Sequence, residues 1–148
     1  MNLLKNCYVS LVMAGTSGGS TGAVSAVIDT ADCEGVLFVA FNSTIATTDF
    51  GIWANMGTSS GLSSTASTIS GSAVYTTSAA TDVAVVLDVY RPQRRYVQAV
   101  ANTPSSGSIG GIVAIKYGLR KAPATQSTAT GFLVINNELS VSASSGTV

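Results

Sequence analysis

Hydrophobic and polar residues alternate with a period of two along most of the chain, in short runs separated by clusters of Gly, Ser, Thr and Asn. Such alternation predicts β-strands that bury one face, and almost no stretch has the period of an amphipathic helix. The expected strands are Tyr8 to Met13, Val24 to Asp29, Val36 to Phe41, Gly51 to Met56, Ala73 to Thr76, Val83 to Tyr90, Arg95 to Ala101 and Ile109 to Tyr117. Eight short strands predict an all-β domain, an antiparallel sandwich or barrel.

The clearest alternation lies in the run from Asp82 to Tyr90. The face predicted to point into the core carries Val83, Val85, Leu87 and Val89, and the opposite face is mixed. Pro92 then ends the strand, because proline has no N–H to donate to a ladder. Together with the two runs that follow it, this run predicts a three-stranded meander over residues 82 to 117. Gly110 and Gly111 fit a β-bulge or a close approach of another backbone.

A chain of 148 residues is long enough to bury a core in one domain. We expect a β-sandwich domain over residues 1–121 and a C-terminal arm over residues 122–148, because the alternation stops after Lys121-Ala-Pro123. The arm contains an apolar tetrad, Phe132, Leu133, Val134 and Ile135. Two interpretations stay open: the tetrad contacts a neighbouring subunit, or it forms an extra edge strand on its own domain.

Charged residues make up only 9% of the chain, hydrophobic residues 46%, and the formal net charge is zero. Few charges and a mean hydropathy of +0.42 suit a protein that packs against other proteins, because surface charge normally keeps a monomer soluble. Neutrality predicts no nucleic-acid partner, and no apolar run reaches the length that spans a bilayer. A short apolar stretch near the N-terminus faintly resembles a signal peptide, but its alternation favours a strand.

The few charges are segregated along the sequence. Six of the seven acids precede position 90, whereas no acid lies among the six basic residues Arg91, Arg94, Arg95, Lys116, Arg120 and Lys121. This separation indicates either a docking face or charges scattered at the ends of turns. The arginines after Tyr90 would then dock on a partner or anchor internally to Asp82 and Asp88.

No catalytic, metal or cofactor site is predicted. Histidine is absent, which excludes Ser-His-Asp and Cys-His catalysis and most zinc sites. The acids Asp29, Asp32 and Glu34 lack the ligand spacing of a calcium loop. Cys7 and Cys33 lack metal-ligand spacing and are expected to be buried free thiols. We therefore do not expect an enzyme.

Two binding alternatives are weighed against structural roles. Arg94, Arg95 and Tyr96 combine cations with an aromatic ring, but a neutral chain with so few cations would bind nucleic acid weakly. Glycine-rich residues 15–22 lack the Gly-Lys-Ser/Thr of a phosphate loop and are expected to be a flexible turn. The aromatic residues Phe50, Trp53 and Tyr75 would suit a sugar-binding platform if exposed, although core packing is favoured.

Residues 82 to 123 carry a family resemblance. The segment Leu-Asp-Val-Tyr-Arg-Pro-Gln-Arg-Arg-Tyr-Val-Gln-Ala-Val, followed by Gly-Gly-Ile-Val-Ala-Ile-Lys-Tyr-Gly-Leu-Arg-Lys-Ala-Pro, resembles the decoration, or cement, proteins of tailed-bacteriophage heads. The matching positions are Arg94, Arg95, Tyr96 and Val97, and then Arg120, Lys121, Ala122 and Pro123. Gln98 stands where an arginine is frequent in that family, and residues 57–72 and the tail beyond Pro123 exceed its pattern.

The resemblance implies a jelly-roll-like sandwich, made in the host cytoplasm, that binds the outside of the capsid and stabilises contacts between major capsid protein subunits. It implies a homo-oligomer, with a trimer expected first and a dimer second. The residues expected to contact capsid or neighbouring subunits are Arg91, Arg94, Arg95, Arg120, Lys121, Phe132, Leu133, Val134 and Ile135. The alternative function is a receptor- or glycan-binding β-sandwich module of a phage tail or fibre.

Overall fold

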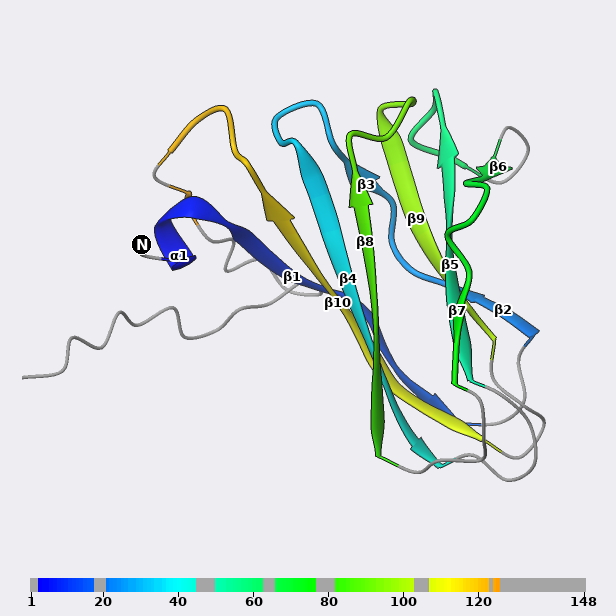
Figure 1. The fold of residues 1–148 in the computed structure, drawn as a ribbon. Helices are drawn as coiled ribbons and strands as arrows, with labels where there is room; N and C mark the ends of the chain where they lie inside the picture. Colours follow the sequence, from blue (N-terminus) through cyan, green and yellow to red (C-terminus); the bar gives the residue numbers. More distant parts are fainter. Residues whose placement is uncertain are drawn as a thin grey trace, which may run out of the picture.

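The structure is a computed structural model (Figure 1) that describes residues 3–17, 21–44, 50–62, 66–76, 82–102, 107–122 and 124–125. The expected C-terminal arm beyond Thr125, with its tetrad Phe132 to Ile135, lies outside the described residues.

The described residues form one short helix and ten strands. They are α1 (Leu3–Asn6), β1 (Tyr8–Ser17), β2 (Thr21–Val24), β3 (Ile28–Asp29), β4 (Gly35–Thr44), β5 (Gly51–Gly57), β6 (Ser67–Thr68), β7 (Val74–Tyr75), β8 (Val83–Tyr90), β9 (Tyr96–Asn102) and β10 (Ser108–Tyr117). All eight predicted strands are present, but the run from Val24 to Asp29 is divided into β2 and β3. The division has a local cause: the Ala26 N–H donates to the Val12 C=O of β1, so the backbone leaves β9 for the other sheet.

The strands form two antiparallel sheets that pack as a β-sandwich, as the sequence predicts (Figure 1). The four-stranded sheet has the order β1-β10-β4-β8. The six-stranded sheet has the order β2-β9-β5-β6, with β3 also paired to β9 and β7 to β5. The chain changes sheet repeatedly, which favours the jelly-roll assignment, and that narrower assignment stays a prediction.

The predicted meander over residues 82–117 is wrong. The strands β8 and β10 both pair with β4 in the four-stranded sheet, whereas β9 lies between β2 and β5 in the other sheet. Alternation specifies which side of a strand is buried but not which strand lies beside it. Here the connection through Pro92 crosses from one sheet to the other instead of forming a tight hairpin, and Arg91 adopts a φ of 48° in it.

The core lies between the two sheets and is made by the inward side chains of both. Its most completely buried large members are Val36, Phe38, Phe50, Ile52, Val97, Ile109 and Ile112. On β8 the buried residues are Val85, Leu87 and Val89, as predicted, with Val83 packed at the margin of the core. The burial is strictly alternate along β8, so every second side chain of this strand points out of the sandwich.

The predicted bulge at Gly110 and Gly111 is confirmed. The pairing of β10 with β4 shifts register between Ile109 and Gly111, and Gly111 has a φ of 138°. A side chain at Gly111 would also place its Cβ 2.9 Å from the Met13 carbonyl oxygen. Glycine is needed here because only glycine adopts this backbone at low cost.

The β4–β8 pairing gives a test of the topology. Phe41 and Ala84 face each other across β4 and β8. The double variant Phe41→Cys with Ala84→Cys should form an intramolecular disulfide on oxidation, detected by peptide mapping under non-reducing conditions, because opposed strand residues lie within disulfide reach. The control is Ala84→Cys with Asn102→Cys, a pair that a β8–β9 hairpin would oppose. A disulfide in the control and none in the first variant would contradict the topology.

Candidate functional site

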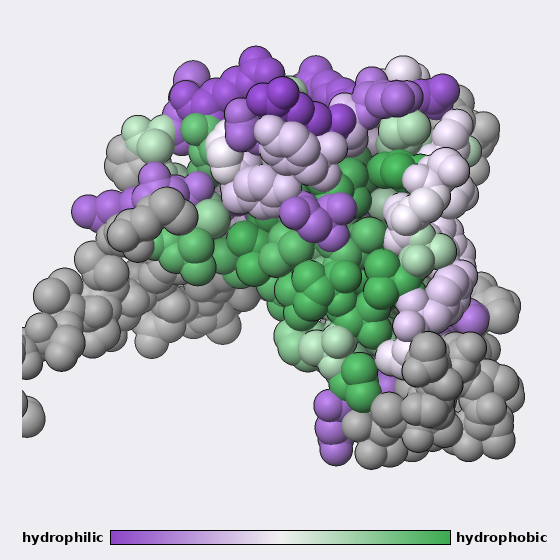
Figure 2. All heavy atoms as spheres, viewed as in Figure 1, coloured by the Kyte–Doolittle hydropathy of each residue, from purple (hydrophilic) through white to green (hydrophobic). Residues whose placement is uncertain are grey.

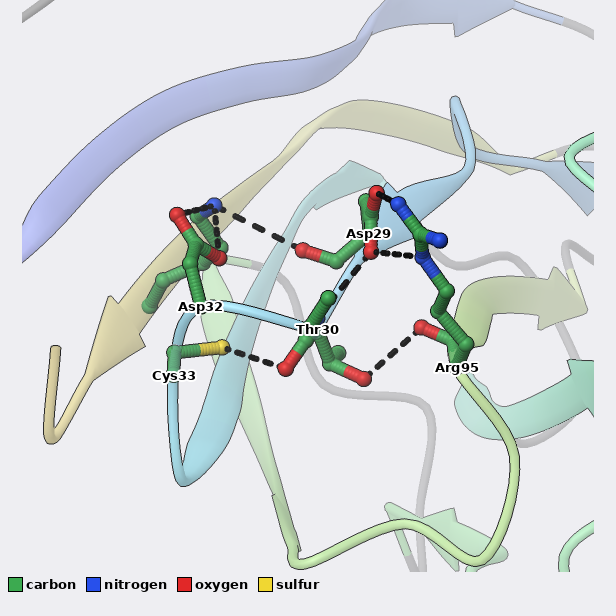
Figure 3. Close-up of polar contacts among 7 residues, drawn as sticks. Asp29, Thr30, Asp32, Cys33 and Arg95 are labelled. Carbon is green, nitrogen blue, oxygen red and sulfur yellow. Dashed lines mark hydrogen bonds and ion pairs between the residues drawn. The ribbon is translucent and has the colours of Figure 1, made fainter. Parts of the chain in front are cut away.

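The acidic turn, residues 29–34, meets the arginine-rich turn, residues 91–95 (Figure 3). Because β3 pairs with β9, Asp29 lies opposite Tyr96, and the neighbouring Arg95 reaches its carboxylate. The Arg95 Nε and Nη2 atoms donate to the two Asp29 oxygens at 2.9 and 2.7 Å. Thr30 ties the two turns further, since its N–H and its hydroxyl both donate to the Arg95 C=O. This bidentate pair fixes the relative position of the two turns.

The ion pair changes the acidity of Asp29. The hydrogen bond from the Arg95 guanidinium is the main cause that lowers the pKa of the Asp29 carboxyl from 3.8 to about 2, and an N–H bond from Ala31 also lowers it. The same pair raises the pKa of Arg95 above its already high value. Asp29 is therefore ionised at neutral and mildly acidic pH.

Two more cations pair with the remaining acids of the turn. The Lys116 Nζ atom lies 2.8 Å from the Asp32 carboxylate, and its ammonium group is 5.3 Å from the centroid of the Tyr8 ring. Arg91 lies 3.6 Å from the Glu34 carboxylate, with both side chains largely exposed. The charges that are separated along the sequence thus pair with one another in the fold.

These contacts correct the predicted internal partners of the arginines. Asp29 and Glu34 are the acids that pair with Arg95 and Arg91, in place of Asp82 and Asp88. Asp88 instead accepts a hydrogen bond of 2.6 Å from the Tyr117 hydroxyl, whose ring lies across Gly35. Burial and this bond raise the pKa of Tyr117.

Four of the five predicted docking cations line one hollow, which we call the arginine groove. It has a volume of about 560 Å³, and its charged lining residues are Arg91, Arg94, Arg95, Arg120 and Glu34. Lys121 lines a separate hollow beside Tyr8 and Asp32. The groove therefore carries an excess of positive charge in a nearly neutral protein, although Arg91 and Arg95 are already paired with acids.

The cysteines are free and buried, as expected. The Cys33 S–H donates to the Thr30 C=O at 3.7 Å, and burial raises the pKa of both thiols. A raised thiol pKa disfavours the reactive thiolate. Within the described ranges, no three Cys, Asp or Glu side chains lie close enough to hold a metal ion.

The outward side of the four-stranded sheet carries aliphatic and aromatic side chains on all four strands. Leu11, Val113, Val39 and Val86 form one row across β1, β10, β4 and β8. The next positions add Val9, Ile115 and Leu37 on one side, and Phe41 and Ala84 on the other. We call these nine residues the apolar face. Val86 is 50% exposed, Phe41 44% and Leu11 36%.

No helix or strand of the described residues packs over the apolar face (Figure 1). Figure 2 shows hydrophobic residues gathered over the region of β10, β4 and β8, with hydrophilic residues along the end where β8 finishes. The outward side of the six-stranded sheet is mixed, because Asn55, Thr68 and Gln98 form one row and Val24, Val100 and Trp53 form another. The face of the four-stranded sheet is therefore the more continuously apolar of the two, because apolar residues occupy adjacent rows on all four of its strands.

The sequence did contain a signal for the apolar face. Residues 36–41 read Val-Leu-Phe-Val-Ala-Phe, without a polar position, and residues 112–115 read Ile-Val-Ala-Ile. A continuous apolar run is typical of a strand that is covered on both sides. These two runs are the central strands β4 and β10. Of the predicted sugar platform, Phe50 is 1% exposed and belongs to the core, whereas Tyr75 is exposed.

Comparisons with known proteins add little. No protein-family model matches the sequence, and no curated protein matches it. A solved structure titled "Bacillus endospore appendages form a novel family of disulfide-linked pili" is similar with a TM-score of 0.42 and 16% sequence identity, over 80% of this chain and 94% of that one. A similarity this low indicates no function for this chain. None of the helices in the described ranges is long and apolar enough to cross a membrane.

The Asp29–Arg95 pair predicts a pH-dependent stability. The folded state holds the Asp29 carboxylate with a pKa of about 2, so its contribution is complete above the unfolded value near 3.8 and is lost as the pH falls from about 4 to about 2. Asp29→Asn keeps an acceptor for the Ala31 N–H but removes the charge. We expect it to lower the free energy of unfolding by about 1 kcal/mol at neutral pH, because the pair is exposed to solvent.

The measurement is urea unfolding at several pH values. The control Asp82→Asn removes a carboxylate that makes no ion pair among the described residues, and asparagine tolerates its φ of 58°. The difference between Asp29→Asn and the unmodified chain should disappear below about pH 2. A difference that is equally large at pH 2 and pH 7 would show that the charge is not its cause.

Proposed function

We propose that the chain is a structural subunit that attaches to a larger protein assembly through its apolar face. The observation that carries this proposal is an exposed outer sheet face with apolar residues in adjacent rows on all four strands, whereas the opposite outer face mixes apolar and polar rows. Burying apolar surface contributes about 25 cal/mol per Å². A contiguous exposed apolar patch on a soluble domain is typical of an interaction site.

The assembly that we propose is the exterior of a bacteriophage head, with the major capsid protein as partner. This part rests on the resemblance carried by Arg94 to Val97 and Arg120 to Pro123. The chain would act mechanically, as a decoration protein that buries surface across the junction between capsid subunits. A standard interface buries about 800 Å² on each partner, and many copies on a symmetric lattice add their modest affinities.

The arginine groove supports the same proposal as a second contact. Guanidinium groups bind carboxylates in a bidentate geometry, so a groove with several of them suits an acidic loop of the partner. The groove and the apolar face belong to neighbouring regions, because Arg91 follows directly on β8. We propose that the apolar face supplies most of the affinity and that the groove fixes orientation.

The apolar face is tested by placing charge on it. Leu11→Lys combined with Phe41→Lys should reduce co-sedimentation with phage heads that lack the protein by at least tenfold, because two ammonium groups would have to be desolvated in the interface. The control is Val24→Lys, which removes an aliphatic side chain of greater exposure, 54%, from the other sheet. Circular dichroism confirms that each variant is folded.

Wild-type binding by the double lysine variant would contradict docking through this face. If the unmodified chain fails to bind heads at all, the phage-head proposal is wrong. If the chain binds glycans but does not bind phage heads, the result would instead support a receptor- or glycan-binding module.

The arginine groove has a matched pair of test positions in adjacent residues. Arg120 lines the groove and Lys121 does not, although both side chains are exposed. Arg120→Glu should weaken head binding by about fivefold at low salt, an effect that shrinks at high salt because exposed charges are screened. Lys121→Glu should bind nearly normally. Equal losses in both variants would indicate a general charge effect and no specific role for the groove.

A further inference from the structure

The strand β8 forms an edge of the four-stranded sheet. Its eight residues pair with β4 from Val83 to Tyr90, and among the described residues no backbone hydrogen bond joins them to any other strand. An edge strand presents a row of unpaired N–H and C=O groups to its surroundings. The other side of β8 is therefore a template on which a further strand can pair.

The pairing pattern identifies which residues point to the open edge. The Arg91 N–H donates to the Glu34 C=O at 2.8 Å, which marks these two as a hydrogen-bonded pair. Hydrogen-bonded and non-hydrogen-bonded pairs alternate along antiparallel strands. The residues of β8 that direct their backbone groups away from β4 are therefore Ala84, Val86, Asp88 and Tyr90.

The other long edge of this sheet is protected, whereas β8 is not. Strand β1 has an irregularity between Leu11 and Met13, and its Val12 carbonyl already accepts a bond from Ala26. Bulges, lysines and prolines are the usual devices that block edges. The sequence of β8, VAVVLDVY, contains no proline, glycine, lysine or arginine. Its one charged residue, Asp88, accepts the Tyr117 hydroxyl.

The open edge is also accessible. A hollow of about 540 Å³ lies beside the second half of β8, and it is lined by residues 87–93, residues 68–72 and Met56. The edge-strand segments of the six-stranded sheet near this side, β6 and β7, are only two residues long each. β5 and β7 also lie near β8, but neither pairs with it, so its backbone groups stay unpaired on that side among the described residues.

We propose that β8 pairs with β8 of a second copy of the chain, antiparallel about a twofold axis through Val86. In this register Val86 lies opposite Val86, Ala84 opposite Asp88, and no carboxylate faces another. The residues whose N–H and C=O groups point away from β4 therefore lie opposite each other in the two copies. A hydrogen-bonded ladder between the two strands requires this arrangement. Like charges opposite each other would be destabilising, and none are.

The pairing joins two four-stranded sheets into one continuous sheet. The inward residues Val85 and Leu87 of the two copies become neighbours across the axis, which extends both cores. The apolar faces become continuous on the outer side, since Ala84 and Val86 form their adjoining margins. This dimer corresponds to the second of the two oligomers that the resemblance implies, and it does not depend on docking to a head.

The edge is tested with Val86→Pro. Because the Val86 N–H points away from β4, proline removes no bond of the fold, but its ring blocks an approaching strand. We expect the dissociation constant of the dimer, measured by analytical ultracentrifugation of the full chain, to rise at least tenfold. Leu11→Lys, on the apolar face but three strands away, should leave the dimer unchanged, which separates this proposal from docking through the face.

Cross-linking tests the register without weakening the interface. Val86→Cys should give a covalent dimer on mild oxidation, whereas Leu11→Cys, also exposed on the same side of the sheet, should not. If Val86→Pro fails to fold, Val86→Lys serves instead, because it keeps the backbone N–H and places an edge-blocking charge at an exposed position.

Three results would overturn the proposal. The first is an unmodified chain that stays monomeric at the highest concentration reached. The second is a dimer that persists in a folded Val86 edge variant, and the third is a Val86→Cys variant that does not cross-link. The C-terminal tetrad is the competing occupant of the edge. If Phe132→Lys with Val134→Lys dissociates the dimer while Val86→Pro does not, the contact is made by the tetrad.

Discussion

The structure depends on contact between the inward side chains of its two sheets. No disulfide, metal site or long helix holds the described strands together, and the chain passes from one sheet to the other at six of the nine connections between strands. Phe38 and Ile112 from one sheet and Ile52 and Val97 from the other are completely buried or nearly so. Because these four strands contribute to one core, each sheet is positioned by the other. The outer faces, the turns and the edges take their places from this core.

The ion pairs at one end of the sandwich are the second constraint on the structure. They show how a chain with few charges can still fix the position of its turns. Three acids at the end of β3 and in the turn that joins it to β4 meet two arginines of the turn between β8 and β9 and one lysine of β10. These exposed pairs contribute little to stability individually. Their arrangement nevertheless fixes how the two turns lie, and so forms the walls of the arginine groove. A cation used as an internal anchor is also held in one orientation, which is favourable for a contact surface because less conformational entropy is lost on binding.

Strand positions were predictable from the sequence, whereas strand neighbours were not. Alternation located β8 to the residue, because a half-buried strand leaves a local period of two. The meander failed because β8, β9 and β10 are adjacent in sequence but pair with β4 and β5, which lie far away along the chain, and no local pattern encodes such pairing. The prediction of Asp82 and Asp88 as arginine partners is wrong for the same reason, because both are close to the arginines in sequence, whereas Asp29 is 66 positions from Arg95. The apolar face was readable in Val36 to Phe41, although its continuity across four strands required the register.

A four-stranded sheet that is apolar on both sides has consequences for composition. The inner side must be apolar to form the core, but nothing in the fold of one chain requires the outer side to be so. A monomer with this face would gain solubility from lysine or glutamate at Leu11, Val39 or Val86 at little cost to its own core. These positions carry no charge, and the edge strand β8 has no residue that blocks pairing. Both features favour contact with another protein on the same side of the molecule. Both features would be stabilising when another protein surface covers them, and this requirement connects the low charge of the whole chain to the proposed role as an assembly subunit.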